Sequence, residues 1–131
     1  MTAAALTGIS PVVLVGDLAR AVDYWTRCLG FTCAAHGDPP DFATADRDGQ
    51  TMLLAHADSP RIVPHWQIVE RMWDAYVRVD DVDAIYAEVW QRGAAIDYEL
   101  DDALHGFREF GVHDPDGHDI AFGQRVVPFA R

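Results

Sequence analysis

The segment Val12–Gly30 reads VVLVGDLARAVDYWTRCLG, and it decides the fold. It opens with an apolar run typical of a strand and continues into a stretch with helical spacing. The apolar residues of that stretch are Leu18, Val22, Trp25 and Leu29. Asp17 suits the N-cap of a helix, and Gly30 suits the left-handed position that follows its last turn. The segment therefore predicts a strand, a short turn and a helix of about three turns.

The same pattern returns in Tyr76–Gly93, which reads YVRVDDVDAIYAEVWQRG. Asp81 corresponds to Asp17 at an offset of 64 residues, about half of the 131-residue chain. A repeat at that offset indicates a tandem duplication. The apolar face of the second helix is predicted to consist of Val82, Ile85, Tyr86 and Val89.

Short apolar stretches separated by turn residues follow each helix. The expected strands cover 31–35, 42–45 and 50–56 in the first half and 94–98, 107–113 and 118–123 in the second. Asp114-Pro-Asp-Gly117 fits a type I turn. The fold class expected is α+β: two tandem βαβββ modules, about 8–57 and 73–126, form a curved, half-open barrel sheet with the helices outside. The chain 1–131 is expected to be a single domain. Its core is expected to include Trp25, Trp90, Phe31 and Phe122.

Composition and charge exclude several classes of protein. The chain is 50% hydrophobic and 24% charged, typical of a globular domain, and its net charge is -11. A nucleic-acid or anionic-membrane partner is excluded, because each requires a basic surface, whereas the acidity permits a cationic ligand. No apolar run approaches a membrane span, and Met1–Leu6 lacks the features of a secretory signal. Cys28 and Cys33 are expected to be reduced, which predicts a cytoplasmic location.

The duplicated pattern resembles the vicinal oxygen chelate superfamily, which includes glyoxalase I, ring-cleaving dioxygenases, fosfomycin-resistance enzymes and bleomycin-resistance proteins. The resemblance extends from about Ile9 to Gln124. The segments that resemble the bleomycin-resistance branch are 21–31, 41–43 with 47–49, 86–88, and 106–110 with 114–117. This resemblance implies a homodimer with ligand clefts between its subunits.

Enzymes of that superfamily hold a divalent metal ion through two His or Glu ligands in each module. The corresponding positions here carry Ser10, Leu53, Asp74 and Ala121. One weak donor among four does not hold a catalytic metal ion. The sequence therefore predicts no metal ion, no cofactor and no catalytic residue at these positions, and no P-loop, G-x-S-x-G or G-x-G-x-x-G motif is found.

The scattered histidines leave one alternative open. His56 closes a predicted strand near the strand that carries a superfamily ligand. A non-standard metal site of His56, Asp74 and Glu109 with either His105 or His113 would support a metal-dependent enzyme of the glyoxalase or dioxygenase type that acts on a small oxygen-rich substrate.

The resemblance also implies a stacking site for a flat ligand. The predicted ligand-binding residues are Phe42, Trp66, Trp73, Asp74, Tyr76, His105 and Phe107. Four acidic residues between Asp97 and Asp102 are expected either to be a solvated face or to form a rim that attracts a cationic ligand. The main hypothesis is a metal-free binding protein that sequesters a cationic aromatic antibiotic of the bleomycin type, or a similar small molecule, in a dimer cleft.

Overall fold

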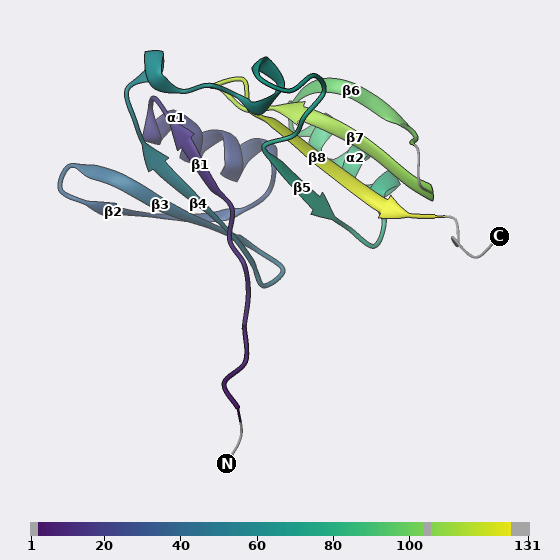
Figure 1. Cartoon of the computed structure of the whole chain (residues 1–131), viewed down its shortest axis with the longest axis horizontal. Coiled ribbons are helices and arrows are strands. Elements are labelled where there is room, and N and C mark those ends of the chain that lie inside the picture. Colours follow the sequence, from purple (N-terminus) through teal and green to yellow (C-terminus); the bar gives the residue numbers. More distant parts are fainter. Residues whose placement is uncertain (1–2, 104–105, 127–131) are drawn as a thin grey trace.

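The computed structural model describes residues 3–103 and 106–126, and the predicted order of elements occurs in it twice (Figure 1). The first module contains β1 (Val12–Val15), α1 (Leu18–Asp23), a π-helical turn (Tyr24–Cys28), β2 (Thr32–Gly37), β3 (Pro40–Arg47) and β4 (Gln50–His56). The second contains β5 (Ala75–Arg78), α2 (Val82–Gln91), β6 (Ala95–Asp102), β7 (Phe107–His113) and β8 (Asp119–Arg125). Two short 3-10 turns, Ser59–Arg61 and His65–Gln67, lie in the connecting segment.

Each module forms a four-stranded sheet, with strand order β1-β4-β3-β2 in the first and β5-β8-β7-β6 in the second. The first strand of each module pairs in parallel with the last, and the other pairs are antiparallel. The sheets do not close into a barrel. The architecture is therefore the predicted one, an α+β fold of two tandem modules in a curved, half-open arrangement.

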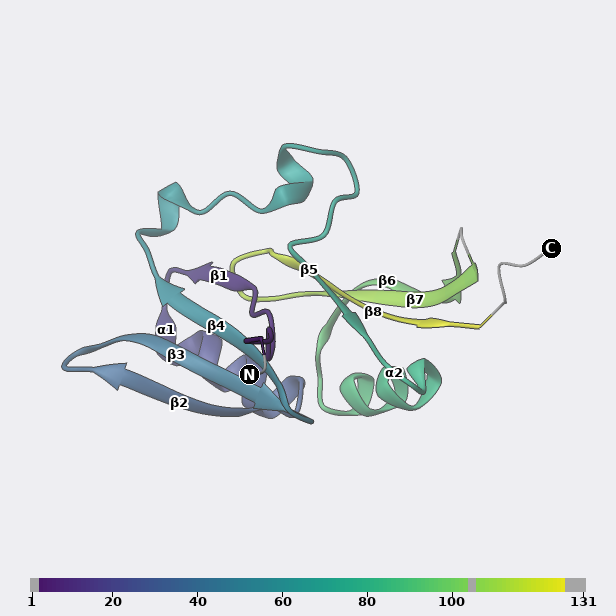
Figure 2. The same ribbon diagram turned by 60° about the horizontal axis from the view of Figure 1, so that its bottom comes forward.

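Figure 2 shows α1 and α2 on the same side of the two sheets, while the connecting segment passes over the opposite side. The sheet faces turned away from the helices therefore share one side of the molecule. No helix within the described residues is long and apolar enough to cross a membrane.

The helix ends agree with the sequence, but the first helix is less regular than expected. Asp17 accepts a hydrogen bond from the backbone N–H of Arg20 (3.1 Å), and Gly30 has a φ of 75°. The α-helix ends at Asp23 and continues as a π-helical turn. In that turn the Leu29 N–H reaches Tyr24 O, five residues back. The predicted apolar face still packs inward.

The core lies between each helix and its sheet. Trp25 is 0% exposed, and its ring meets Phe31 edge to face with the centroids 4.9 Å apart. In the second module Tyr86 packs against Phe110 at 4.9 Å. The expectation that Trp90 is core was wrong, because the residue is 55% exposed, although its ring meets the Tyr86 ring edge to face at 5.5 Å. It follows Val89, the buried position, and therefore points away from the sheet.

Two segments expected to be loops belong to strands. Residues 99–102 extend β6 beyond its predicted end, and His36–Gly37 and Pro40–Asp41 extend the β2–β3 hairpin. Hairpin pairing explains both cases. Gly37 pairs with Pro40, and Asp101 and Asp102 pair with Glu109 and Arg108, despite the polar or proline-rich composition of these stretches.

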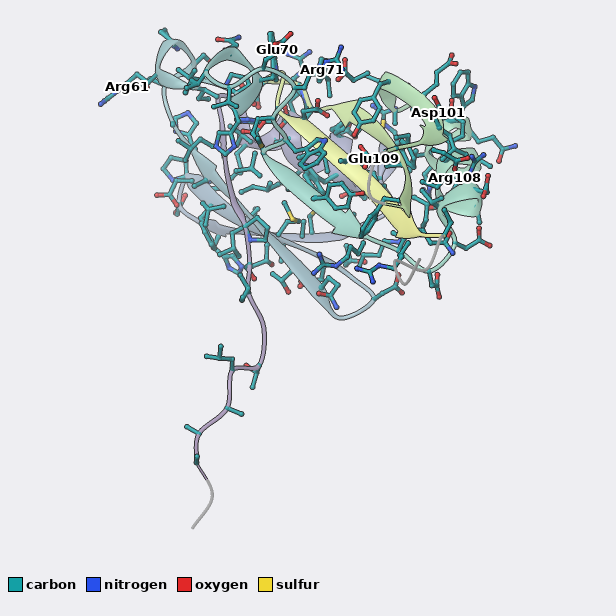
Figure 3. All side chains as sticks on the ribbon, turned by 45° about the vertical axis from the view of Figure 1, so that its right-hand side comes forward. Arg61, Glu70, Arg71, Asp101, Arg108 and Glu109 are labelled. Carbon is teal, nitrogen blue, oxygen red and sulfur yellow. The ribbon has the colours of Figure 1, made fainter. Side chains whose placement is uncertain are left out.

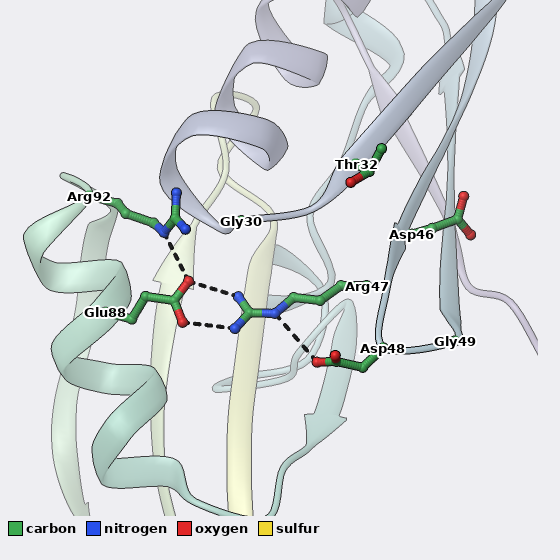
Figure 4. A pocket seen from close by; sticks show the side chains of 8 residues that line it. All are labelled: Gly30, Thr32, Asp46, Arg47, Asp48, Gly49, Glu88 and Arg92. Atoms are coloured by element: carbon green, nitrogen blue, oxygen red, sulfur yellow. Dashed lines mark hydrogen bonds and ion pairs between the residues drawn. The ribbon is translucent and has the colours of Figure 1, made fainter.

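Ion pairs and hydrogen bonds join the modules. Arg47 of β3 donates to both oxygens of Glu88 on α2 (2.8 and 3.1 Å), and Arg92 donates to Glu88 Oε2 (2.8 Å) (Figure 4). At the other end Asp116 accepts the Gly16 N–H (3.1 Å). The Arg47–Glu88 and Gly16–Asp116 contacts therefore tie residues of the first module to residues of the second.

Candidate functional site

The face of the second sheet that is turned away from α2 carries an aromatic and acidic cavity of about 650 Å³. The residues that line it are Arg71, Trp73, Asp97, Tyr98, Ala103, Glu109 and Asp119. Strand alternation explains the lining, because Phe110, Val112, Ile120 and Phe122 all face the core. Their neighbours Glu109 and Asp119 must then face the cavity. Figure 3 shows Glu109 over the strands of this sheet and Arg71 on the connecting segment.

Two glycines on the floor of the cavity leave space for two tyrosine rings, because a side chain at either position would occupy the place of a ring. A Cβ added at Gly111 would collide with the Tyr98 ring, and one added at Gly123 would collide with the Tyr76 hydroxyl. The register pairs Gly123 with Glu109 and Gly111 with Ala121. Only small residues at these floor positions allow both rings to lie flat against the backbone.

Glu109 is held between the two tyrosines. The Tyr76 hydroxyl donates to Glu109 Oε1 (2.9 Å), and the Tyr98 hydroxyl donates to Glu109 Oε2 (2.8 Å). Burial first, and then the hydrogen bond to Glu109, raise the pKa of both phenols well above the ordinary value. Both hydroxyls therefore remain neutral donors, and the carboxylate is fixed in orientation on the cavity floor.

Further aromatic rings border this carboxylate. The Trp73 Nε1–H donates to the Tyr98 hydroxyl (3.0 Å). The rings of Trp73 and Tyr76 meet edge to face at 4.7 Å, and Tyr76 meets Phe107 in the same way at 6.0 Å. The cavity thus combines aromatic edges and faces with a fixed negative charge, an arrangement suited to a flat cation.

Three metal-capable side chains gather at one end of the sheet, Asp97 of β6, His113 of β7 and Asp119 of β8. One donor atom from each lies within 4.8 Å of the others. His113 Nε2 is 3.4 Å from Asp97 Oδ1. Burial, followed by the neighbouring Asp97 carboxyl and the charges of Asp74 and Glu109, raises the pKa of Asp119 to about 7.

The structure brings several of the predicted ligand-binding residues together. Trp73, Tyr76 and Phe107 form the chain of ring contacts described above, and Trp66 stacks on His113 with the centroids 6.0 Å apart. His105 lies outside the described residues.

Two predicted residues lie elsewhere. Phe42 is on β3 of the other sheet, where its ring approaches His36 at 6.2 Å. Asp74 does not line the cavity: its side chain is 7% exposed and accepts hydrogen bonds from the backbone N–H groups of His65 (3.2 Å) and Asp119 (3.0 Å). Asp74 therefore holds the connecting segment against β8.

The positions of the superfamily metal ligands carry no ligand set in this fold. Leu53 and Ala121 lie on the helix-averted faces of β4 and β8, opposite to their buried neighbours Leu54 and Ile120. Ser10 precedes β1 and is exposed.

The alternative metal site is not brought together. His56 follows Met52 and Leu54 at two-residue steps on β4, and both of these residues are buried against α1. His56 lines a cavity beside the start of α1 instead. Among the described residues, no group of three metal-capable side chains contains His56, Asp74 or Glu109.

Tyr98 and Asp119 are site residues that the sequence analysis missed. Tyr98 was the last residue of an expected strand, and Asp119 was the second residue of another. The signal that could have found them is the pair of glycines at 111 and 123, because small residues on one strand face leave room for large neighbours across the ladder.

The comparisons with known proteins agree with this architecture. Residues 8–122 match the family described as the Glyoxalase/Bleomycin resistance protein/Dioxygenase superfamily. The uncharacterized protein Mb0911c of Mycobacterium bovis is 28% identical over 127 residues, which cover 90% of this chain and 83% of that protein.

Two solved structures illustrate the similarity of fold. The bleomycin-binding protein from bleomycin-producing Streptomyces verticillus, complexed with copper(II)-bleomycin, matches with a TM-score of 0.68 and 24% identity, over 96% of this chain and 100% of that chain. TnmS3, an antibiotic binding protein from Streptomyces sp. CB03234, matches with a TM-score of 0.71 and 23% identity, over 95% of this chain and 99% of that chain.

Proposed function

The chain belongs to the glyoxalase/bleomycin resistance protein/dioxygenase superfamily, and from that premise we propose that it is a binding protein for a cationic aromatic small molecule of the bleomycin type. The observation that carries this proposal is the cavity of about 650 Å³ in which Glu109 is fixed between tyrosine hydroxyls. A cavity of that size is suited to a drug-sized ligand.

The chemistry of the cavity supports sequestration without reaction. Trp73 and Tyr98 offer surfaces for a planar heteroaromatic group. Among the described residues that line the cavity, the carboxylates of Asp97 and Glu109 outnumber the single guanidinium of Arg71 even without Asp119, whose pKa is raised to about 7. The net charge of -11 raises the local concentration of a cationic ligand around the whole molecule. Stacking and charge complementarity therefore suffice for binding, and the superfamily metal positions take no part in it.

The antibiotic-binding relatives support the ligand class. One solved neighbour is a bleomycin-binding protein and another is an antibiotic binding protein. The alternative of a metal-dependent glyoxalase or dioxygenase would need His or Glu at the superfamily positions, where Leu53 and Ala121 have no donor atoms.

A second copy of the chain would complete the site. β1 exposes Val12 (58%) and Leu14 (43%) on the face turned away from α1, and the preceding segment exposes Leu6 (92%) and Ile9 (87%). Apolar side chains in such a row mark an interaction surface. We therefore keep the homodimer with ligand clefts between its subunits as part of the proposal. Light scattering coupled to size exclusion tests it, and Leu14→Glu is expected to yield monomers, whereas Val63→Glu on the connecting segment is not.

Two further predictions belong to the proposal. The chain 1–131 is one domain, supported by the ion pair between Arg47 and Glu88 across the modules. Its location is cytoplasmic, supported by the free thiols of Cys28 and Cys33, which a reducing compartment preserves.

A titration of tryptophan fluorescence with bleomycin tests the binding function. The buffer is stripped of metal ions, because the drug in the neighbouring complex carries copper(II). Saturable quenching at one drug molecule per chain, weakened by added salt, is expected. The absence of any saturable response at micromolar to millimolar drug would reject bleomycin-type ligands and leave the fold assignment unaffected.

A further inference from the structure

Asp97, His113 and Asp119 form a compact donor group on three adjacent strands, outside the superfamily metal positions. His113 of β7 pairs with Asp119 of β8. On its other side His113 pairs with Ala95 of β6, which lies two residues before Asp97. The shift in register between Ile96 and Tyr98 brings Asp97 to the same edge. One imidazole nitrogen and two carboxylates thereby lie within 4.8 Å of one another.

Asp119 supplies an independent sign that a cation belongs there. The residue is 5% exposed, and within the described residues its Oδ1 atom has no hydrogen-bond partner. A buried carboxylate oxygen without a donor costs several kcal/mol unless a positive charge or a proton compensates it. No arginine or lysine side chain within the described residues forms an ion pair with this group.

The surroundings hold the imidazole ring in place for coordination. Trp66 stacks on His113 with an interplanar angle of 20°, and the Trp66 Nε1–H donates to Gly117 O (2.7 Å), which fixes the indole. The stacked indole therefore limits the orientations open to the imidazole ring.

We propose that Asp97, His113 and Asp119 bind one divalent transition-metal ion, such as Zn²⁺ or Co²⁺, at the end of the cavity. Mixed imidazole and carboxylate donors favour these ions over Mg²⁺ and Ca²⁺, which prefer oxygen ligands alone. Ligand atoms on one such ion are separated by about 3–4 Å, so the donors of this group need only a small contraction. Because Asp97 and Asp119 line the cavity, the remaining coordination positions face its interior.

The experiment uses the metal alone. Chelator-stripped protein is titrated with Co²⁺, followed by the visible absorption of the bound ion, and with Zn²⁺ in a calorimeter. One ion per chain is expected. Asp119→Asn and His113→Asn are expected to weaken binding by at least about tenfold. If either of these variants fails to fold, as judged by circular dichroism, Asp97→Asn replaces it in the test, because Asp97 is exposed and its substitution disturbs the core less.

Two matched variants control for charge and for histidine as such. Glu99→Gln removes an exposed carboxylate from the same strand, and His36→Asn removes an exposed histidine from the other module. Both are expected to bind Co²⁺ as the unmodified chain does. The proposal is overturned if the unmodified chain binds no ion at millimolar metal, or if the three cluster variants bind as tightly as it does. Neither result bears on bleomycin binding, which is measured without metal.

Discussion

The Tyr98 hydroxyl donates a hydrogen bond to Glu109 Oε2 over 2.8 Å, from one strand to the next across the floor of the cavity. This contact requires the absence of a side chain at Gly111, on which the Tyr98 ring lies. The orientation of the charge that faces a ligand thus depends on a floor glycine that contributes no side chain of its own.

Replacing Glu109 by Gln tests the role of that charge. The amide retains an acceptor for one tyrosine hydroxyl but loses the negative charge, so bleomycin affinity should fall by roughly tenfold, as expected for about 1.5 kcal/mol from a charged contact. Fluorescence titration at low salt measures the effect. Glu99→Gln on neighbouring β6 is the matched control. An equal loss of affinity in both variants would show that Glu109 acts only through the net charge of the protein and not through a contact with the ligand.

Replacing Gly111 by Ala tests the floor. The added methyl group collides with the Tyr98 ring, which cannot move without breaking its hydrogen bonds to Trp73 and Glu109. We expect a loss of about 1–3 kcal/mol in the free energy of unfolding, measured by urea denaturation. Gly8→Ala meets nothing within 4 Å and should leave stability unchanged. A stable Gly111→Ala protein with normal ligand affinity would contradict the argument.

Replacing Trp73 by Phe removes the fluorescence of the cavity tryptophan and leaves that of the other three. Trp73 is the one tryptophan among the cavity-lining residues, whereas Trp90 is exposed on α2. Most of the quenching by bleomycin should therefore disappear in Trp73→Phe and persist in Trp90→Phe. Quenching that is lost in Trp90→Phe instead would place the ligand on another surface.

Stability should increase as the pH falls from 8 to 5. Burial raises the pKa of Asp114 from 3.8 to about 6, so the folded protein binds this proton more tightly than the unfolded chain. The resulting stabilisation is complete below about pH 4 and is lost as the pH rises through 6. Asp119, with its pKa raised to about 7, acts in the same direction. The expected gain is on the order of 1–3 kcal/mol, measured by urea denaturation in the presence of a chelator.

Asp114→Asn is the control for this pH dependence. The amide oxygen can still accept the backbone N–H groups of Asp116 and His118, while the titrating group is removed. Its slope between pH 8 and 5 should be smaller. The carboxyls whose pKa is lowered, Asp23 and Glu88, withdraw stability only below their ordinary values, outside this window. A slope unchanged by the substitution would exclude Asp114 as its source.

The sequence by itself determined the duplication, the order of elements and the helix ends. Asp17 and Asp81 both accept the backbone N–H three residues on, and Gly30 and Gly93 both adopt the left-handed conformation. These features are local, since capping and turn geometry depend on residues within a few positions of one another. The superfamily resemblance follows from the same local signals, which occur once in each module.

Only the tertiary structure decided which side chains meet at the site. His56 lies on the α1 side of β4 and Leu53 on the other, a difference of face that a register change of one residue would reverse. The Asp74 carboxylate accepts a hydrogen bond from the backbone N–H of Asp119. The Tyr98 hydroxyl reaches Glu109 because β6 pairs with β7. Such contacts join residues distant in sequence, and the strand pairing that creates them depends on the packing of the whole sheet.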